Sequence, residues 1–261
     1  MSKRKADDTN VRNKKAKHYA LEYAPDELKN DKDFVLQAIS QDGNALRFAS
    51  KELQGGKEVV MQAISSIAHA LYYASEQLKN DKEFILQVVS QNGYALQYAS
   101  KEFNNDKEVV MQAILHHGDA LWCVSDELQG DKEVVMQAVS NDGYAIRDAS
   151  SELQGDREVV MQAISQKADA ILYASNELKN DKEVVMQAIS QNADALQFAS
   201  NELKNDKEFM LQVISQNADA IQYASKELQE DIEVQMKSKQ FYRLPGELHQ
   251  LINTRFKFDF K

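Results

Sequence analysis

A 25-residue period runs through the chain without a single insertion. The unit DKEVVMQAISQNADALQFASNELKN, residues 181–205, recurs about eight times after an N-terminal half-copy, YALEYAPDELKN. Three positions of the unit hardly vary: one holds Ala20, Ala45, Ala70, Ala95, Ala120, Ala145, Ala170, Ala195 and Ala220, a second holds Ser50, Ser75, Ser100, Ser125, Ser150, Ser175, Ser200 and Ser225, and a third holds Leu28, Leu53, Leu78, Phe103, Leu128, Leu153, Leu178, Leu203 and Leu228. Each copy must therefore form the same local structure and meet its neighbours in the same way.

Each unit carries two helical patterns. In the first, Val59, Val60, Ala63 and Ile64 fall on one face of a helix. The aspartate that opens most copies, such as Asp81, suits the N-cap of that helix. In the second, the apolar residues Ala45, Leu46, Ala49 and Leu53 follow a similar spacing, and an Asn or Gly then precedes the next aspartate. Asn and Gly tolerate the left-handed conformation that ends many helices. The sequence thus predicts a short helix pair.

The repeated serine position, from Ser50 to Ser225, is called the serine column below. It leaves open whether the second pattern forms one continuous helix. A serine inside a helix can bond back to the carbonyl four residues earlier and bend the helix. In the half-copy Pro25 stands in this column, and proline is poorly tolerated inside a helix but suits its start. We therefore expect a break in that copy, and the pattern does not decide whether the other copies break too.

A helix pair of this size buries its apolar face only by stacking on its neighbours. The sequence therefore predicts an all-α fold, an α-solenoid of about eight and a half 25-residue helix-pair repeats over residues 18–240. Residues 1–17 are expected to be a disordered basic tail and residues 241–261 a C-terminal capping segment. Nine glycines and two prolines agree with helices joined by short loops.

The repeat unit resembles that of a known family. Its DKE opening, its Ala-Leu-x-Tyr/Phe-Ala-Ser core and its Leu-x-Asn-Asp junction recur in register over roughly residues 19–240, and all three resemble the repeat catalogued as domain of unknown function 4116. The resemblance implies a helical repeat. It implies no reaction, no cofactor and no catalytic residue.

Charge is distributed unevenly along the chain. Residues 1–17 carry seven Lys/Arg and two Asp, a net of +5, and residues 237–261 carry six Lys/Arg and two acidic residues, a net of +4. Residues 18–236 carry 18 basic and 37 acidic residues, a net of −19. An acidic body repels phosphate, so we expect a basic protein partner rather than nucleic acid. No long apolar run suggests a secretory signal or a membrane span, and the single cysteine suits a reducing compartment.

Binding residues of a solenoid are expected in columns that vary. One such column holds Glu22, Arg47, Tyr72, Gln97, Trp122, Arg147, Leu172, Gln197 and Gln222, and a second holds Tyr19, Asn44, His69, Tyr94, Asp119, Tyr144, Asp169, Asp194 and Asp219. We predict protein binding at Arg47, Tyr72, Trp122, Arg147 and Leu172 of the first column and at His69, Tyr94 and Tyr144 of the second. Alternatively, Tyr72, Trp122 and Leu172 cover a neighbouring helix, and the aspartates serve a helix dipole.

Residues with chemical potential gather in LHHGDALWCVS, residues 115–125. His116, His117, Asp119 and Cys123 match no strong zinc pattern, and adjacent histidines point about 100° apart around a helix. Cys123 stands in a column of aromatic residues and is expected to pack there, with Trp122 able to fill the space it leaves. No catalytic motif or phosphate loop is present, so we expect no enzyme, no metal or cofactor, and no small-molecule substrate.

Two motifs lie at the ends of the chain. Lys3, Arg4, Lys5, Lys14, Lys15 and Lys17 resemble a nuclear import signal read by an import receptor, although a merely solubilising tail would look similar. In the tail, Leu244, Pro245, Glu247 and Leu248 resemble the start of an F-box, or equally a short amphipathic cap helix. The sequence favours a non-enzymatic interaction scaffold that is nuclear, or alternatively cytoplasmic, and not secreted. The alternative function is a ubiquitin-ligase adaptor.

Overall fold

The computed structural model describes residues 21–115, 117–231 and 234, and within them every regular element is helical. The chain divides into two compact units, unit 1 over residues 1–150 and unit 2 over residues 151–261, which we describe separately. The all-α helical repeat predicted from the sequence is confirmed. The predicted tail, residues 1–17, and the predicted capping segment, residues 241–261, lie outside the described residues.

The elements follow one another in the same order along the repeats, except that the 3-10 helix η4 takes the place of the short α-helix in one of them. Those of unit 1 are α2 (Asp26–Lys29), α3 (Lys32–Ile39), η1 (Gly43–Phe48), α4 (Lys51–Gln54), α5 (Lys57–Ser66), η2 (Ala68–Tyr73), α6 (Glu76–Lys79), α7 (Lys82–Gln91), η3 (Gly93–Tyr98), η4 (Lys101–Asn105), α8 (Lys107–Ile114), η5 (Gly118–Cys123), α9 (Asp126–Gln129), α10 (Lys132–Asn141) and η6 (Gly143–Asp148). Those of unit 2 are α11 (Ser151–Gln154), α12 (Arg157–Gln166), η7 (Ala168–Tyr173), α13 (Asn176–Lys179), α14 (Lys182–Gln191), η8 (Ala193–Phe198), α15 (Asn201–Lys204), α16 (Lys207–Gln216), η9 (Ala218–Tyr223) and α17 (Lys226–Glu230).

The first segment of each repeat is an α-helix of eight to ten residues, such as α3 or α14. The expected N-cap is confirmed at Asp181, whose side chain accepts hydrogen bonds from the backbone of Glu183 and Val184. The apolar face is confirmed as well, since Val59, Val60, Ala63 and Ile64 are all buried. Burial of these side chains contributes to the hydrophobic stabilisation of the repeat.

The second pattern forms two segments, separated at the serine column. A six-residue 3-10 helix comes first, and it ends where the alanine before the serine becomes extended, with φ −61° and ψ 156° at Ala199. Ser200 is then the N-cap of α15, because its Oγ accepts a hydrogen bond from the backbone of Leu203. Pro25 occupies the same N-cap position before α2. The question left open by the sequence is thereby answered: the described copies break at this column, and each repeat holds three helical segments.

The serine column also joins consecutive repeats. The backbone nitrogen of Ser200 donates to the carbonyl of Lys179, at 2.9 Å, and its hydroxyl donates to Oδ1 of Asn180, at 2.5 Å. Ser50 makes the same two contacts with Lys29 and Asn30 in unit 1. Each break in the second pattern thus gives the chain polar groups that bind the preceding repeat.

The Asn/Gly column differs from expectation. Asn180 has φ −99° and Gly55 has φ −94°, so neither adopts the left-handed conformation that these residue types suggest. Asparagine suits this column for another reason. Its side-chain oxygen accepts a hydrogen bond from the hydroxyl of the serine twenty residues later, as Oδ1 of Asn205 does from Ser225. The column therefore serves contacts between repeats.

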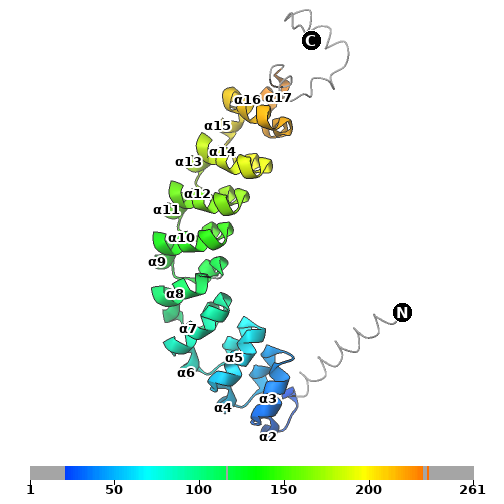
Figure 1. Cartoon of the computed structure of the whole chain (residues 1–261), viewed down its shortest axis with the longest axis vertical. Coiled ribbons are helices and arrows are strands. Elements are labelled where there is room, and N and C mark those ends of the chain that lie inside the picture. The colour runs from blue at the N-terminus through cyan, green and yellow to red at the C-terminus, as the bar shows by residue number, and fades with distance from the viewer. Residues whose placement is uncertain (1–20, 116, 232–233, 235–261) are drawn as a thin grey trace, which may run out of the picture. The chain divides into compact units, whose positions relative to one another are not determined.

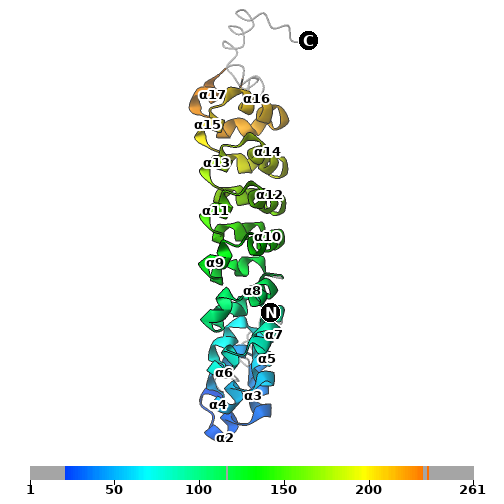
Figure 2. The same cartoon turned by 90° about the vertical axis from the view of Figure 1, so that its left-hand side faces the viewer.

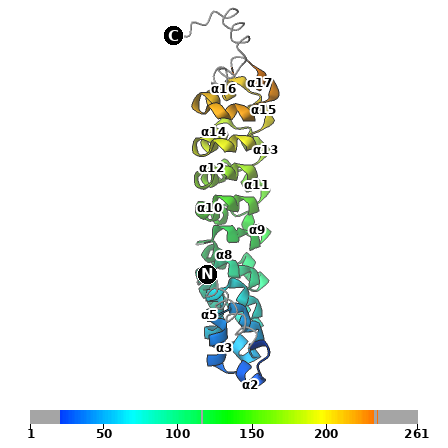
Figure 3. The ribbon, with the colours of Figure 1, turned by 90° about the vertical axis from the view of Figure 1, so that its right-hand side faces the viewer.

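Equivalent segments of neighbouring repeats stack in rows. In unit 2 the short helices α11, α13 and α15 form one row and the long helices α12, α14 and α16 another (Figures 1 and 2). In unit 1 the helices α3, α5 and α7 likewise follow one another (Figure 2), and Figure 3 shows α3 and α5 from the opposite side. The core between the rows is built from Val, Ile, Leu and Ala side chains such as Val60, Leu71 and Ile85.

A row of ion pairs runs along the starts of the long helices. Lys107 Nζ lies 2.7 Å from Asp131 and 2.8 Å from Glu133 of the following repeat, and Lys182 lies 2.6 Å from Asp206 in unit 2. The hydrogen bond from Lys107 holds the pKa of Asp131 below its usual value, and Asp131 and Glu133 together raise the pKa of Lys107. Most of these pairs are open to solvent, so each adds little alone and their number matters more.

Candidate functional site

The two variable columns come together on the 3-10 helices. They are the second and fifth residues of each six-residue 3-10 helix, such as His69 and Tyr72 in η2. A 3-10 helix has three residues per turn, so side chains three apart lie directly above one another. The residues between them, Ala70 and Leu71, are fully buried. The two columns therefore form one surface along the 3-10 helices.

In unit 1 this surface is aromatic around η2. The ring of His69 stacks on Tyr72, with centroids 5.6 Å apart and planes within 7°, and it meets Tyr73 and Tyr98 edge-on, at 5.1 Å each. Its Nδ1 lies 2.8 Å from Oδ1 of Asn44. Tyr72 packs against Tyr73 but remains 60% exposed. Tyr72 is thus a large apolar side chain held in place by its neighbours and open to solvent.

On the next two six-residue 3-10 helices, η3 and η5, an aromatic ring is paired with a carboxylate. Tyr94 of η3 donates its hydroxyl hydrogen bond to Asp119 of η5, and its ring lies 5.0 Å from that of His117. The hydrogen bond with Asp119, partial burial, and the charges of Asp119 and Asp142 raise the pKa of Tyr94 to about 12. His117 is fixed from its other side, since its Nδ1 accepts from the backbone nitrogen of Gly93 at 3.3 Å.

Trp122 occupies in η5 the position that Tyr72 occupies in η2, and 46% of its surface is exposed. Slightly more than half of its surface is thus covered by neighbouring residues. The thiol of Cys123 contacts the carbonyl of Ala120 at 3.0 Å, and burial, together with the nearby Asp119 and Asp148, raises its pKa to about 11. A thiol of this kind is a packing group rather than a nucleophile.

Cations already lie against aromatic rings in this unit. The guanidinium of Arg47 sits 4.3 Å from the ring centroid of Phe48, and the ammonium of Lys79 sits 5.9 Å from that of Tyr72. Arg147 instead pairs with the adjacent Asp148, at 3.0 Å. We use the term aromatic edge for the side chains of His69, Tyr72, Tyr73, Tyr94, Tyr98 and Trp122, which line η2, η3 and η5.

The sequence treated the two columns separately and missed part of this cluster. Tyr73 and Tyr98 join it from the aromatic column that the sequence assigned to packing, and His117 joins it from the segment weighed as a zinc site. The signal that could have found them is the spacing of 29 residues between His69 and Tyr98, which places the sixth residue of one 3-10 helix against the second residue of the preceding one. Predicted Tyr144, in η6, is 38% exposed.

Unit 2 carries a different surface at the same positions. The second residues of its 3-10 helices are Asp169, Asp194 and Asp219, each in a first turn where a carboxylate suits the helix dipole. Asp169 accepts a hydrogen bond from Asn192 at 3.1 Å, and Asp194 accepts one from Tyr223 at 2.6 Å. Among the described residues of unit 2, Leu172 is the exposed large apolar side chain, at 43%. Five of the eight predicted binding residues in the two columns, namely His69, Tyr72, Tyr94, Trp122 and Tyr144, are thus aromatic residues of unit 1.

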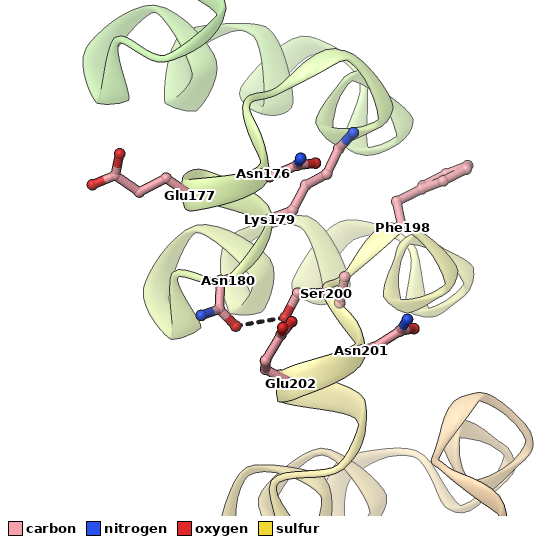
Figure 4. Close-up of a pocket in the computed structure, with 9 residues that line it drawn as sticks. Asn176, Glu177, Lys179, Asn180, Phe198, Ser200, Asn201 and Glu202 are labelled. Carbon is pink, nitrogen blue, oxygen red and sulfur yellow. Dashed lines mark hydrogen bonds between the residues drawn. The ribbon is translucent and has the colours of Figure 1, made fainter.

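An open groove of about 550 Å³ lies between the short helices α13 and α15 (Figure 4). Lys179, Phe198, Asn201 and Glu202 line it, and the Ser200–Asn180 hydrogen bond crosses its floor. Partial burial lowers the pKa of Lys179. The equivalent lysine of the next repeat, Lys204, donates to the carbonyl of Gln197 in η8.

The zinc site weighed from the sequence and the two terminal motifs fall wholly or partly outside the described residues. No group of His, Cys, Asp and Glu suited to a metal ion occurs within residues 21–115, 117–231 and 234, and His116 lies outside them. Within the same residues, none of the helices has the length and apolarity that crossing a membrane requires. The import-like residues 3–17 and the F-box-like residues 244–248 also lie outside the described ranges.

Comparison with known proteins identifies the repeat. The model of the family described as domain of unknown function (DUF4116) matches residues 15–54, 57–104, 106–154, 156–204, 181–229 and 206–238. No curated protein and no solved structure matches the chain significantly. The matches follow the 25-residue period through both units, and the chain belongs to the DUF4116 family of helical repeats.

Proposed function

We propose that the protein is a non-enzymatic scaffold that binds a basic protein partner through the aromatic edge of unit 1. The observation that carries the proposal is the exposure of Trp122 and Tyr72 on one stacked surface. Tryptophan and tyrosine are the side chains that most often dominate protein interfaces, at roughly 2 kcal/mol or more each when a partner buries them. An isolated exposed apolar residue carries no such weight, but a row of them does.

Charge supports a basic partner. Described residues 21–150 hold 21 Asp/Glu and 11 Lys/Arg, a net of −10. Asp119 is the second residue of η5 and Trp122 the fifth, so the 3-10 geometry places one carboxylate beside the exposed indole. An arginine or lysine of a partner would meet both an aromatic face and a carboxylate there, as Arg47 already meets Phe48 within the chain.

Affinity capture with matched variants tests this proposal. Wild-type protein, Trp122→Ala and Gln197→Ala are used as baits, and captured proteins are quantified by mass spectrometry. Gln197 occupies the same exposed column in unit 2, so its substitution controls for trimming any side chain of that column. We expect basic proteins that are lost with Trp122→Ala and kept with Gln197→Ala. Equal capture by all three baits would refute the role of the aromatic edge.

We further propose that Lys3, Arg4, Lys5, Lys14, Lys15 and Lys17 direct the protein to the nucleus through an import receptor. Residues 1–17 fused to a fluorescent reporter should concentrate it in nuclei, and a fusion with the six residues changed to serine should not. A reporter that stays evenly distributed would reject nuclear import and favour a cytoplasmic location.

The alternative function, a ubiquitin-ligase adaptor, is supported by the motif at Leu244, Pro245, Glu247 and Leu248. The same capture experiment distinguishes it from a plain scaffold. Recovery of a ligase subunit by the wild-type bait, and its loss with the double variant Pro245→Ala and Glu247→Ala, would favour the adaptor.

A further inference from the structure

Trp122 stands in the most acidic stretch of unit 1. Residues 101–150 contain ten Asp/Glu and four Lys/Arg. Two of the carboxylates, Asp119 and Asp148, act on the neighbouring Cys123, and Asp142 acts with Asp119 on Tyr94. Asp119 and Trp122 are three residues apart on the 3-10 helix η5, so one carboxylate lies beside the exposed indole, and a guanidinium or ammonium group is attracted by both the ring face and this carboxylate.

The chain itself contains a segment with this chemistry. Residues 3–17 hold seven Lys/Arg and precede the first described residue, Leu21, by only a few positions. Lys5 lies 16 residues before Leu21, so it reaches up to about 53 Å when extended. The 3-10 helix η5 is four repeats beyond the half-copy, which is about 40 Å at the usual spacing of packed helices. The segment is long enough to reach Trp122, and its tether keeps it there at a roughly millimolar effective concentration.

We propose that, in the free protein, the basic segment of residues 3–17 lies along the aromatic edge of unit 1, with Lys3, Arg4 and Lys5 against Trp122. The segment and a basic protein partner then compete for one surface. Binding of the partner releases the segment, and with it the six residues that resemble an import signal. This inference rests on the proposed function in one respect: it uses the same surface, though not the same occupant.

Fluorescence of Trp122 in the full chain tests the inference directly, because the protein has a single tryptophan. Quenching by acrylamide, a neutral molecule, reports how much of the indole is accessible and is insensitive to surface charge. The measurement compares wild type with a variant in which Lys3, Arg4, Lys5, Lys14, Lys15 and Lys17 are changed to serine. A matched control changes the six basic residues of the other end, Lys237, Lys239, Arg243, Arg255, Lys257 and Lys261, to serine.

We expect the dynamic quenching constant at low ionic strength to rise about two-fold in the N-terminal variant and to stay at the wild-type value in the control. In about 1 M NaCl, where charges are screened within about 3 Å, the wild type should reach the variant's value. Equal quenching of all three proteins at low ionic strength would overturn the inference, as would an equal rise in the C-terminal control. Far-ultraviolet circular dichroism verifies that the helices of each variant are intact.

The outcomes separate this inference from the proposed function. If Trp122 is equally accessible in all three proteins while Trp122→Ala still loses basic partners, the intramolecular contact is wrong and the scaffold stands. If the N-terminal variant uncovers Trp122 but Trp122→Ala captures the same proteins as wild type, the intramolecular contact stands and the proposed partner site is wrong.

Discussion

Replacing Ser200 by alanine should destabilise the protein, and the sign of the effect is informative. The hydroxyl of Ser200 accepts the N-cap hydrogen bond of α15 at 3.0 Å and donates to Asn180 at 2.5 Å. Loss of an N-cap costs about 1 kcal/mol, and loss of a hydrogen bond between exposed groups costs about 0.5 kcal/mol. We therefore expect the free energy of unfolding to fall by about 1.5 kcal/mol, which lowers the melting temperature by roughly 3–6 °C in a chain of this size.

A continuous second helix would give the opposite result. Alanine is the better residue in a helix interior, by about 0.5 kcal/mol over serine. Ser190 is a matched control in the same repeat, since it lies inside α14, is exposed and donates to the carbonyl of Gln187. We expect Ser190→Ala to be neutral or slightly stabilising. The assay is urea unfolding of the full chain followed by circular dichroism, and a Ser200→Ala variant as stable as Ser190→Ala would refute the break at the serine column.

Four further predictions follow from burial and charge. Phe84→Ala should lower the free energy of unfolding by about 3–5 kcal/mol, because Phe84 is fully buried. Trp122→Ala should change the urea midpoint little, because Trp122 is exposed, and a large fall in that midpoint would place Trp122 in the core. The hydrogen bonds from Lys57, Lys107 and Lys182 lower the pKa of Asp81, Asp131 and Asp206, so their contribution to stability is present above about pH 3.9 and is lost as the pH falls through the lowered values. The pKa values of Lys82, Lys107 and Lys182 are raised, so their contribution is present below about pH 10.4 and is lost as the pH rises through the raised values; urea midpoints that do not fall at either extreme would contradict both statements. Since the pKa of Cys123 is raised from 9.0 to about 11, the thiol should react with iodoacetamide at pH 8 about 100-fold more slowly than in urea, and equal rates would contradict its burial.

Much of the fold could be predicted from the period alone. The Asp N-caps and the apolar columns are local signals. Because the repeats are nearly identical, each must also pack on its neighbours in the same way. The break before the short helix was harder to predict, because serine is compatible with both a helix interior and an N-cap. The hydrogen bond between Ser200 and Asn180 favours the N-cap over the helix interior. It joins two different repeats, so it becomes evident only in the folded structure.

The candidate site was predicted residue by residue but not as a surface. On an α-helix His69 and Tyr72 would lie about 60° apart around the axis, whereas a 3-10 helix places them in line, and their rings stack. The exposure of Trp122 likewise depends on how Cys123 and its neighbours pack, which composition does not reveal. Variation in a column indicates where to look, and the helix type decides which columns meet.

A hydrogen–deuterium exchange footprint of a captured basic partner on the full chain tests the aromatic edge as a binding surface most directly. We expect binding to slow exchange in η2, η3 and η5, residues 68–73, 93–98 and 118–123, and to leave exchange in the short helices α13 and α15 unchanged. Protection that spares these three 3-10 helices and falls elsewhere would contradict the assignment of the aromatic edge as the binding surface.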